Sequence, residues 1–184
     1  MAKLQSEKNL LWLDLEMTGL DPVHQTIIEI ATLITDADLN VIAEGPSIAI
    51  FHDQSILDNM EDWSLKTHTK SGLLKKVTGS QITLQQAEET TLAFISTYCV
   101  RQKTPLCGNS IGHDRRFLEK YMPKLFAYLH YRNIDVSTLK ELIRRWYPKG
   151  PAPPAKKTRH LALDDIYESI GEMKFYREHY FIKL

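Results

Sequence analysis

The sequence has few cysteines, no excess of charge of either sign and no long hydrophobic run. Its two cysteines, Cys99 and Cys107, fit neither a metal-binding nor a redox motif, so we expect reduced thiols in the core. The apolar run Leu10–Leu13 is far too short to span a membrane, and no longer run is free of charge. No signal peptide is recognisable. These absences predict a cytosolic protein with no membrane partner.

The charge is balanced, with 23 Lys plus Arg against 23 Asp plus Glu. Proteins that hold long duplexes neutralise many phosphates with cationic side chains, so this balance argues against a long duplex as partner. It leaves room for a small anionic ligand held by metal ions and a few local donors. The 184 residues suffice for one domain with a sizeable core, and we expect a single domain over residues 1–184.

The stretch LLWLDLEMTGL at residues 10–20 carries the strongest sign of a functional site. An apolar run closed by Thr-Gly predicts a buried strand, and alternation along a strand points Asp14 and Glu16 the same way. Two buried carboxylates repel each other and are costly to desolvate, and a divalent cation such as Mg²⁺ or Mn²⁺ offsets that cost. The alternative is that both acids lie at the solvated end of the strand without a metal.

The remaining pattern predicts an α/β fold. Further strands are expected at 26–35, 41–51 (with a bulge or break at Gly45-Pro46), 105–110 and 131–136. Helices are expected at 55–60, 63–77, 84–99 after an N-cap at Thr83, 117–128 with a break at Pro123, 137–146 capped by Ser137, and 161–180, with a Pro-rich loop at 147–157. The order of elements predicts a mixed five-stranded sheet, antiparallel in its front half and parallel in its back half, flanked by helices.

Three more acids stand near predicted helix starts, namely Asp114, Asp164 and Asp165. Taken singly, an acid in a first helical turn often does no more than complement the helix dipole. His160 lies at the exit of the Pro-rich loop, where a lone histidine is usually a surface or capping residue. None of these residues identifies a site by itself.

In combination these residues resemble the three motifs of the DEDDh exonucleases. The motifs are Asp14 with Glu16, Asn109 to Asp114, and His160 to Asp165. The similarity continues through LLWLDLEMTGLDP, GNSIG-DRRFL, YRNIDVSTLKEL, LDDI-ES and YREHYFIKL, so it covers nearly the whole chain, and it is strongest to members that act on very short RNA. The resemblance implies an RNase H-like fold and removal of nucleotides from the 3′ end.

The resemblance also implies roles for the acids and the histidine. Two divalent metal ions, Mg²⁺ or Mn²⁺, would be held by Asp14, Glu16, Asp114 and Asp165. The family spacing His-x4-Asp selects Asp165, although on a straight helix His160 would share a face with Asp164. His160 would be the general base, because a reference pKa of about 6.5 suits proton uptake near neutral pH. The product would be a nucleoside 5′-monophosphate.

A short substrate offers little backbone to grip, so its bases and terminal phosphate must supply the binding. Leu20 would wedge between two bases, Trp63 would stack on one of them, and His68 would lie one helical turn further on. Donors suited to a 5′ phosphate are Ser110, Ser137 and Arg132. In this interpretation the closed end selects dinucleotides. The alternative is that Leu20 and Trp63 are core residues beside an open groove.

The segment Tyr128–Arg132 combines two tyrosines, a histidine and an arginine, which is typical of interface anchors. The resemblance implies a homodimer in which Tyr131 and Arg132 reach the neighbour's site. The alternative is simple packing of Tyr128 and Tyr131 under the last helix.

One residue departs from the family, and two other functions compete. His113 stands where family members usually carry Gln, and we assign it no catalytic role. A DNA-proofreading-type exonuclease is disfavoured by the neutral charge. A non-catalytic nucleotide-binding module would require loss of a motif residue, yet all five are present.

Overall fold

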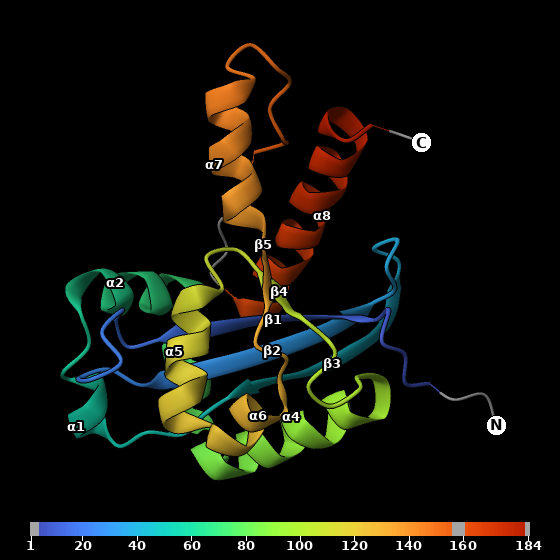
Figure 1. The fold of residues 1–184 in the computed structure, drawn as a ribbon. Helices are drawn as coiled ribbons and strands as arrows, with labels where there is room; N and C mark the ends of the chain where they lie inside the picture. Colours follow the sequence, from blue (N-terminus) through green and yellow to red (C-terminus); the bar gives the residue numbers. More distant parts are fainter. Residues whose placement is uncertain (1–3, 156–160, 183–184) are drawn as a thin grey trace.

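The protein folds around one five-stranded sheet with helices on both faces (Figure 1). This computed structural model describes residues 4–155 and 161–182. The strands are β1 (Leu10–Met17), β2 (Ile27–Thr35), β3 (Val41–Ala49), β4 (Leu106–Gly108) and β5 (Asn133–Asp135), in the order β3-β2-β1-β4-β5. The β1–β2 and β2–β3 pairs are antiparallel, whereas β1–β4 and β4–β5 are parallel. The predicted mixed sheet is confirmed.

Strand positions agree with the sequence pattern better than strand lengths do. The β2–β3 register shifts where Gly45 and Pro46 are inserted, which confirms the predicted bulge. β4 is shorter than predicted because Ser110 has a positive φ of 52°, which ends the extended backbone. β5 is shorter because Val136 already belongs to the next helix.

Most helices lie where the pattern places them. Thr83 and Gln86 form a reciprocal capping box, Gly72 with a φ of 78° separates the second helix from the third, and Pro123 begins the sixth. The helices are α1 (Gln54–Leu57), α2 (Asp62–Ser71), α3 (Leu73–Gly79), α4 (Leu84–Tyr98), α5 (Gly112–Tyr121), α6 (Pro123–Tyr128), α7 (Val136–Trp146) and α8 (Ala162–Tyr180).

The predicted cap of α7 is wrong. The side chain of Asp135 accepts a hydrogen bond from the Ser137 backbone N–H over 2.9 Å, so Asp135 is the N-cap. The cap therefore lies two residues earlier than expected. This earlier cap leaves the Ser137 hydroxyl available for contacts outside the helix.

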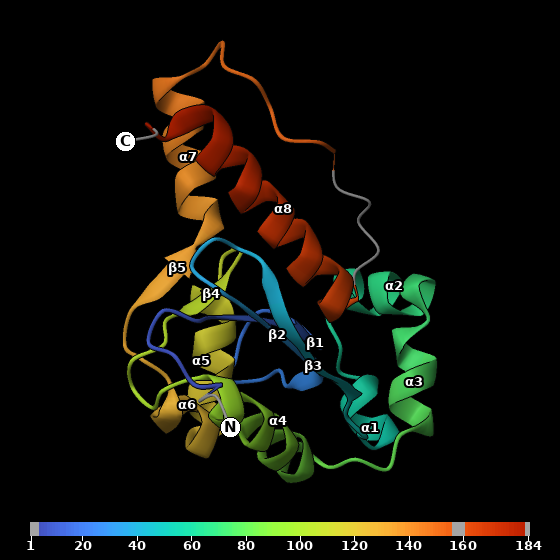
Figure 2. The same ribbon diagram turned by 90° about the vertical axis from the view of Figure 1, so that its right-hand side faces the viewer.

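The sheet separates two apolar layers, and the alternation along β1 decides which residue faces which layer. Leu11, Leu13 and Leu15 pack with α4, α5 and α6, whereas Trp12 packs with α8. Asp14 and Glu16 share the orientation of Trp12, so they point toward the layer of α8, which crosses that face of the sheet (Figure 2).

Two simpler expectations can also be compared with the structure. Cys99 and Cys107 are both free and buried, as predicted from their spacing. In residues 4–155 and 161–182, no helix is long and apolar enough to cross a membrane.

Candidate active site

Three carboxylates from two separate elements converge at the carboxyl end of β1. Asp14 and Glu16 come from the strand and Asp165 from the first turn of α8, and their nearest oxygens all lie within 4.8 Å of one another. The structure thus brings Asp165 into this group, as the family spacing predicts. Oxygen donors at this density suit a small, hard divalent cation such as Mg²⁺ or Mn²⁺.

Asp114 approaches the same place from α5. Its Oδ1 accepts a hydrogen bond from the Leu15 backbone N–H over 2.9 Å, at the residue between Asp14 and Glu16. The side chain is buried and lines the same cavity as those two acids. Asp114 therefore lies beside Asp14 and Glu16, although the group whose oxygens lie within 4.8 Å of one another consists of Asp14, Glu16 and Asp165.

Burial makes these carboxylates reluctant to ionise in the absence of a cation. Desolvation is the main cause that raises the pKa of Glu16 to about 8 and the pKa of Asp114 to about 7. Desolvation also raises the pKa of Asp14 well above its ordinary value, and the charges of Asp114 and Glu16 raise it further. A divalent cation would remove both the desolvation penalty and the repulsion, so the donor set fits such an ion.

A cavity of about 210 Å³ lies beside the carboxylates and is lined by four of the predicted substrate contacts, Leu20, Trp63, His68 and Ser110. Leu20 is 60% exposed and Trp63 is 64% exposed, so neither is a core residue. His68 is buried, its Nε2–H donates to the Met17 carbonyl over 3.1 Å, and the same nitrogen lies 3.8 Å from Glu16 Oε2. His113 also lines the cavity.

A residue that sequence reasoning missed holds the loop of Leu20 beside Trp63. Glu61 Oε1 accepts from the Leu20 backbone N–H over 3.2 Å, and the Glu61 backbone N–H donates to the Thr18 carbonyl over 2.9 Å. A Cβ added at Gly19 would collide with the carboxyl group of Glu61, so glycine permits this close approach. Glu61 precedes α2, which carries Trp63, and in the sequence it could only be recognised as an acid near a helix start.

Two predicted phosphate donors, Ser110 and Ser137, form a pair, of which only Ser110 lines the cavity beside the carboxylates. The hydroxyl oxygens of Ser110 and Ser137 lie 3.0 Å apart. Ser137 Oγ donates to Asn109 Oδ1 over 3.1 Å, and Asn109 Nδ2 donates to Ser169 Oγ of α8 over 2.8 Å. Asn109 thus connects the serine pair to the helix that carries Asp165, a link between distant segments that the sequence does not reveal.

Three predicted substrate contacts that the structure describes, Ser137, Tyr131 and Arg132, do not line this cavity. Tyr131 is 72% exposed, which excludes its packing under α8, and the Arg132 guanidinium carbon lies 5.3 Å from the Tyr131 ring centre. Neither residue lines the 210 Å³ cavity in the part of the chain that the structure describes. His160 lies outside the described residues.

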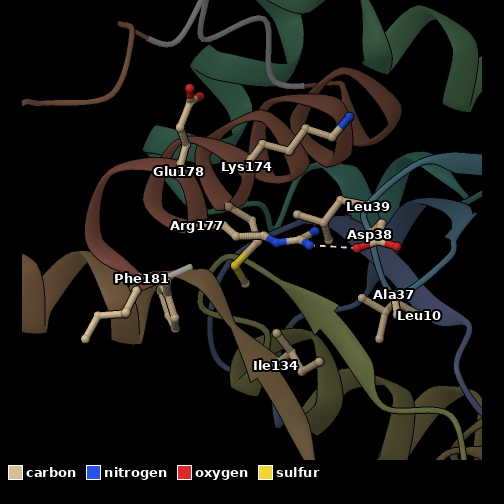
Figure 3. A pocket seen from close by; sticks show the side chains of 11 residues that line it. Leu10, Ala37, Asp38, Leu39, Ile134, Lys174, Arg177, Glu178 and Phe181 are labelled. Atoms are coloured by element: carbon tan, nitrogen blue, oxygen red, sulfur yellow. Dashed lines mark hydrogen bonds and ion pairs between the residues drawn. The ribbon is translucent and has the colours of Figure 1, made fainter. Parts of the chain in front are cut away.

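A larger cavity of about 890 Å³ lies elsewhere, between the β2–β3 turn and the C-terminal half of α8 (Figure 3). Apolar side chains such as Leu10, Leu39 and Phe181 line it, and Arg177 forms an ion pair with Asp38 over 2.6 Å beside them. None of the predicted site residues that the structure describes lines this cavity. The larger cavity is therefore not the one that contains the predicted site residues.

Comparison with known proteins was made for both the sequence and the fold. Residues 11–173 match a family described as "Exonuclease". An oligoribonuclease from Salmonella typhimurium is 57% identical over 178 residues, covering 97% of this chain and 98% of that protein. An oligoribonuclease from Escherichia coli is 56% identical over 179 residues, with the same two coverages of 97% and 98%.

The fold is similar to that of Escherichia coli exonuclease I, solved in complex with a dT13 oligonucleotide. The TM-score is 0.72 at 15% sequence identity, and the match covers 94% of this chain and 41% of that chain. At this identity the likeness concerns the fold alone, and it confirms the predicted RNase H-like class.

Proposed function

The chain belongs to the exonuclease family, and from this premise we propose that it is a metal-dependent 3′-to-5′ exoribonuclease that degrades short oligoribonucleotides. Dinucleotides are its preferred substrates and nucleoside 5′-monophosphates its products. Relatives more than half identical over nearly the full length carry the name oligoribonuclease. The observation that carries the proposal is the convergence of Asp14, Glu16 and Asp165 within 4.8 Å.

Two divalent cations, Mg²⁺ or Mn²⁺, would be held by Asp14, Glu16, Asp114 and Asp165. Such ions, when bound, acidify a water molecule and stabilise negative charge on a phosphate and its leaving oxygen. The protein's part would be to hold these four carboxylates, which come from β1, α5 and α8, near one another. Because burial raises the pKa values of Glu16 and Asp114 to about 8 and about 7, cation binding displaces protons near neutral pH.

His160 is proposed as the general base on the strength of its sequence position, five residues before Asp165. It would accept a proton as a water oxygen attacks the phosphorus of the last phosphodiester. The bond between phosphorus and the 3′ oxygen of the preceding nucleotide breaks, and that oxygen leaves with the shortened chain. The released terminal nucleotide keeps the phosphate on its 5′ oxygen.

The substrate's bases and its 5′ phosphate would occupy opposite ends of the site. Leu20 and Trp63 expose apolar surface beside the carboxylates, which suits a wedge and a stacking platform. The Ser110–Ser137 hydroxyl pair suits a terminal phosphate. A phosphate-binding end closes the site and excludes longer chains sterically.

We further propose a homodimer in the cytosol, with Arg132 of the partner subunit completing the 5′-phosphate site. The exposure of Tyr131 and the stacking of Arg132 beside it support an interface at this segment. The location rests on the sequence alone, as does the proposal that residues 1–184 form a single domain.

A turnover assay tests the function directly. A 5′-labelled RNA dinucleotide is incubated with the protein in Mg²⁺ and, separately, in EDTA, and the reaction is repeated with long single-stranded DNA. We expect mononucleotide release from the RNA dimer only with the cation. Preferential digestion of the long DNA would instead identify a proofreading-type exonuclease, and binding without turnover would identify a nucleotide-binding module.

A further inference from the structure

Glu29 is a buried acid that the proposed function does not use. It lies on β2 directly opposite Glu16 of β1, and opposed residues of an antiparallel pair project from the same face of the sheet. Its residue exposure is only 1%. A second carboxylate buried beside Glu16 raises the pKa of Glu16, which is an unfavourable arrangement unless Glu29 has another role.

The contacts of Glu29 lead to the helix that carries Asp165. Glu29 Oε2 accepts a hydrogen bond over 3.1 Å from the backbone N–H of Ala162, the first residue of α8. Glu29 Oε1 lies 3.2 Å from Ser47 Oγ of β3, which donates to it. The carboxylate therefore bridges the sheet and the start of α8.

This bridge takes the place of a local helix cap. The N-cap residue of α8 is Leu161, which has no side-chain hydrogen bond to offer, so a carboxylate from β2 satisfies the first N–H instead. A negative charge at this end also complements the helix dipole. The Asp165 N–H donates to the Leu161 carbonyl over 3.1 Å, so Asp165 is bonded into the turn that Glu29 anchors.

We propose that Glu29 is a positioning residue that fixes the first turn of α8, and with it Asp165, against Asp14 and Glu16. The inference rests on the proposed function in so far as Asp165 is a metal ligand. Groups that orient ligands typically change metal affinity or activity by about 10- to 100-fold when they are removed.

A direct role as a fifth ligand fits the contacts less well. Both oxygens of Glu29 already accept hydrogen bonds within the protein. The group whose oxygens converge consists of Asp14, Glu16 and Asp165, and Glu29 is not a member. Its contacts connect the sheet to the first residue of α8.

Two conservative variants separate the reach of the side chain from its charge. Glu29→Gln keeps the length, so its amide oxygen can accept from Ala162 and its amide nitrogen can donate to Ser47, while the charge is lost. Glu29→Asp keeps the charge but is one methylene shorter, so the bridge cannot span both partners. Mn²⁺ affinity by calorimetry and hydrogen exchange of the 161–166 segment in the metal-free protein are measured for both.

Positioning predicts that Glu29→Asp is the more damaging change. It should weaken Mn²⁺ binding by about 10- to 100-fold and speed exchange of the Asp165 amide several-fold. Glu29→Gln should keep exchange near the wild-type rate and bind Mn²⁺ more tightly than Glu29→Asp does. The proposal would be overturned if the Asp165 amide of Glu29→Asp exchanged at the wild-type rate. It would also be overturned if Glu29→Gln bound Mn²⁺ more weakly than Glu29→Asp does.

Glu88 provides a matched control for the loss of a buried carboxylate that caps a helix. Its Oε1 accepts from the backbone N–H groups of Lys124 and Leu125 over 2.7 and 3.0 Å at the start of α6, which packs in the other apolar layer from α8. Glu88→Asp should lower the melting temperature without changing Mn²⁺ affinity. Equal losses of affinity in Glu88→Asp and Glu29→Asp would show a general effect of stability and refute the inference.

The experiment also distinguishes this inference from the proposed function. Wild-type protein that binds Mn²⁺ but does not cleave an RNA dinucleotide would refute the exoribonuclease, and the Glu29 variants would still report on positioning. The positioning role alone would be refuted if the wild-type protein cleaved the RNA dinucleotide and Glu29→Asp equalled it in Mn²⁺ affinity and in exchange of the Asp165 amide.

Discussion

The backbone N–H of Leu15 donates to Asp114 Oδ1 over 2.9 Å, and this bond joins α5 to the strand that carries the other acids. It orients the Asp114 carboxylate beside Asp14 and Glu16. It also stabilises the charged form of Asp114, partly opposing the desolvation that raises the pKa of this acid to about 7. An asparagine at the same position retains an oxygen that can accept this bond.

Asp114→Asn is therefore expected to lower kcat strongly without disturbing the fold. Loss of one carboxylate removes several kcal/mol of metal-dependent stabilisation, so kcat should fall by about 100-fold or more. Turnover of an RNA dinucleotide at saturating Mg²⁺ gives the rate, and circular dichroism checks the fold. Glu119→Gln, an exposed acid of the same helix, is the control and should keep wild-type activity. Near-normal turnover by Asp114→Asn would contradict its role as a ligand.

The stability of the metal-free protein should fall as the pH rises. Glu16, Asp114 and Asp14 have folded-state pKa values above their ordinary values, so between about pH 4.5 and pH 8 the folded state binds more protons than the unfolded state. The free energy of unfolding then decreases across this interval. Scanning calorimetry in EDTA at pH 5, 6, 7 and 8 should show a declining melting temperature, at least above pH 6.

Two controls test the origin of that decline. Saturating Mg²⁺ should raise the melting temperature most at pH 8, where the carboxylates are ionised most readily. Asp14→Asn should raise the metal-free melting temperature at pH 8, because it removes one of the mutually repelling charges. A metal-free melting temperature that increases steadily from pH 6 to pH 8 is incompatible with the raised pKa values.

His160→Ala should slow the chemical step by roughly 10²- to 10⁴-fold, as expected for loss of a general base. Substrate affinity should change much less, because the carboxylates and the base-stacking residues remain. Single-turnover kinetics with a saturating dinucleotide measure this step. The matched control is His113→Gln, which introduces the residue usual in the family and should stay near the wild-type rate. A His160→Ala protein that loses affinity but keeps its single-turnover rate would identify a ligand clamp instead.

Local sequence signals predicted the backbone elements around the site well. The apolar run around Asp14 and Glu16 predicted both the strand and the shared face of the two acids. The Thr83 cap and the Gly45-Pro46 bulge were also predicted, since each depends on a few neighbouring residues. Resemblance to a family was needed to select Asp165 over Asp164, because helical spacing alone favoured Asp164.

What the sequence could not reveal depends on contacts between distant segments. The sequence pattern predicted Ser137 as the cap of α7, and only the fold shows that Asp135 caps this helix while Ser137 faces Ser110. Glu29 interrupts the apolar run of β2, and its partner Ala162 lies 133 residues away in the sequence. Such long-range pairs carry no local pattern.

Complementation between two inactive variants tests the proposed dimer. If Arg132 acts in the neighbour's site, Asp14→Asn and Arg132→Ala protomers mixed through a cycle of dissociation should regain activity. A mixed dimer then has one site with intact acids that receives Arg132 from the other subunit. Up to one active site per mixed dimer is expected, measured as cleavage of a 5′-phosphorylated dinucleotide.

Light scattering supplies the control for that experiment. The wild-type protein should have twice the 21.3 kDa mass of one chain at micromolar concentration. A fully active species of 21.3 kDa would exclude the dimer as a requirement. A dimer that shows no complementation would place Arg132 in the site of its own chain.

Length selectivity is the most specific consequence of a site closed at its 5′ end. The value of kcat/KM for a 5′-phosphorylated dinucleotide should far exceed that for a 5′-phosphorylated seven-mer, because the proposed phosphate-binding end would leave no room for a third nucleotide. Trp63→Ala should weaken binding of the dinucleotide by about 1–3 kcal/mol, the usual contribution of one base stacked on an aromatic ring. Trp146→Ala is the matched control, since Trp146 is as exposed as Trp63 but lies on α7.

The Ser110–Ser137 pair allows the closed end to be separated from simple stacking. Removing the 5′ phosphate from the dinucleotide should lower kcat/KM for the wild-type protein. The decrease should be much smaller for Ser137→Ala, because this variant has already lost the hydroxyl that is proposed to bind the phosphate. Trp63→Ala should respond to removal of the phosphate as the wild type does, because stacking is independent of that end. Equal kcat/KM values for the dinucleotide and the seven-mer would reject the closed site, even if Trp63 proved to stack on a base. An open groove would then explain the exposure of Leu20 and Trp63, and discrimination by length would have to arise outside this chain.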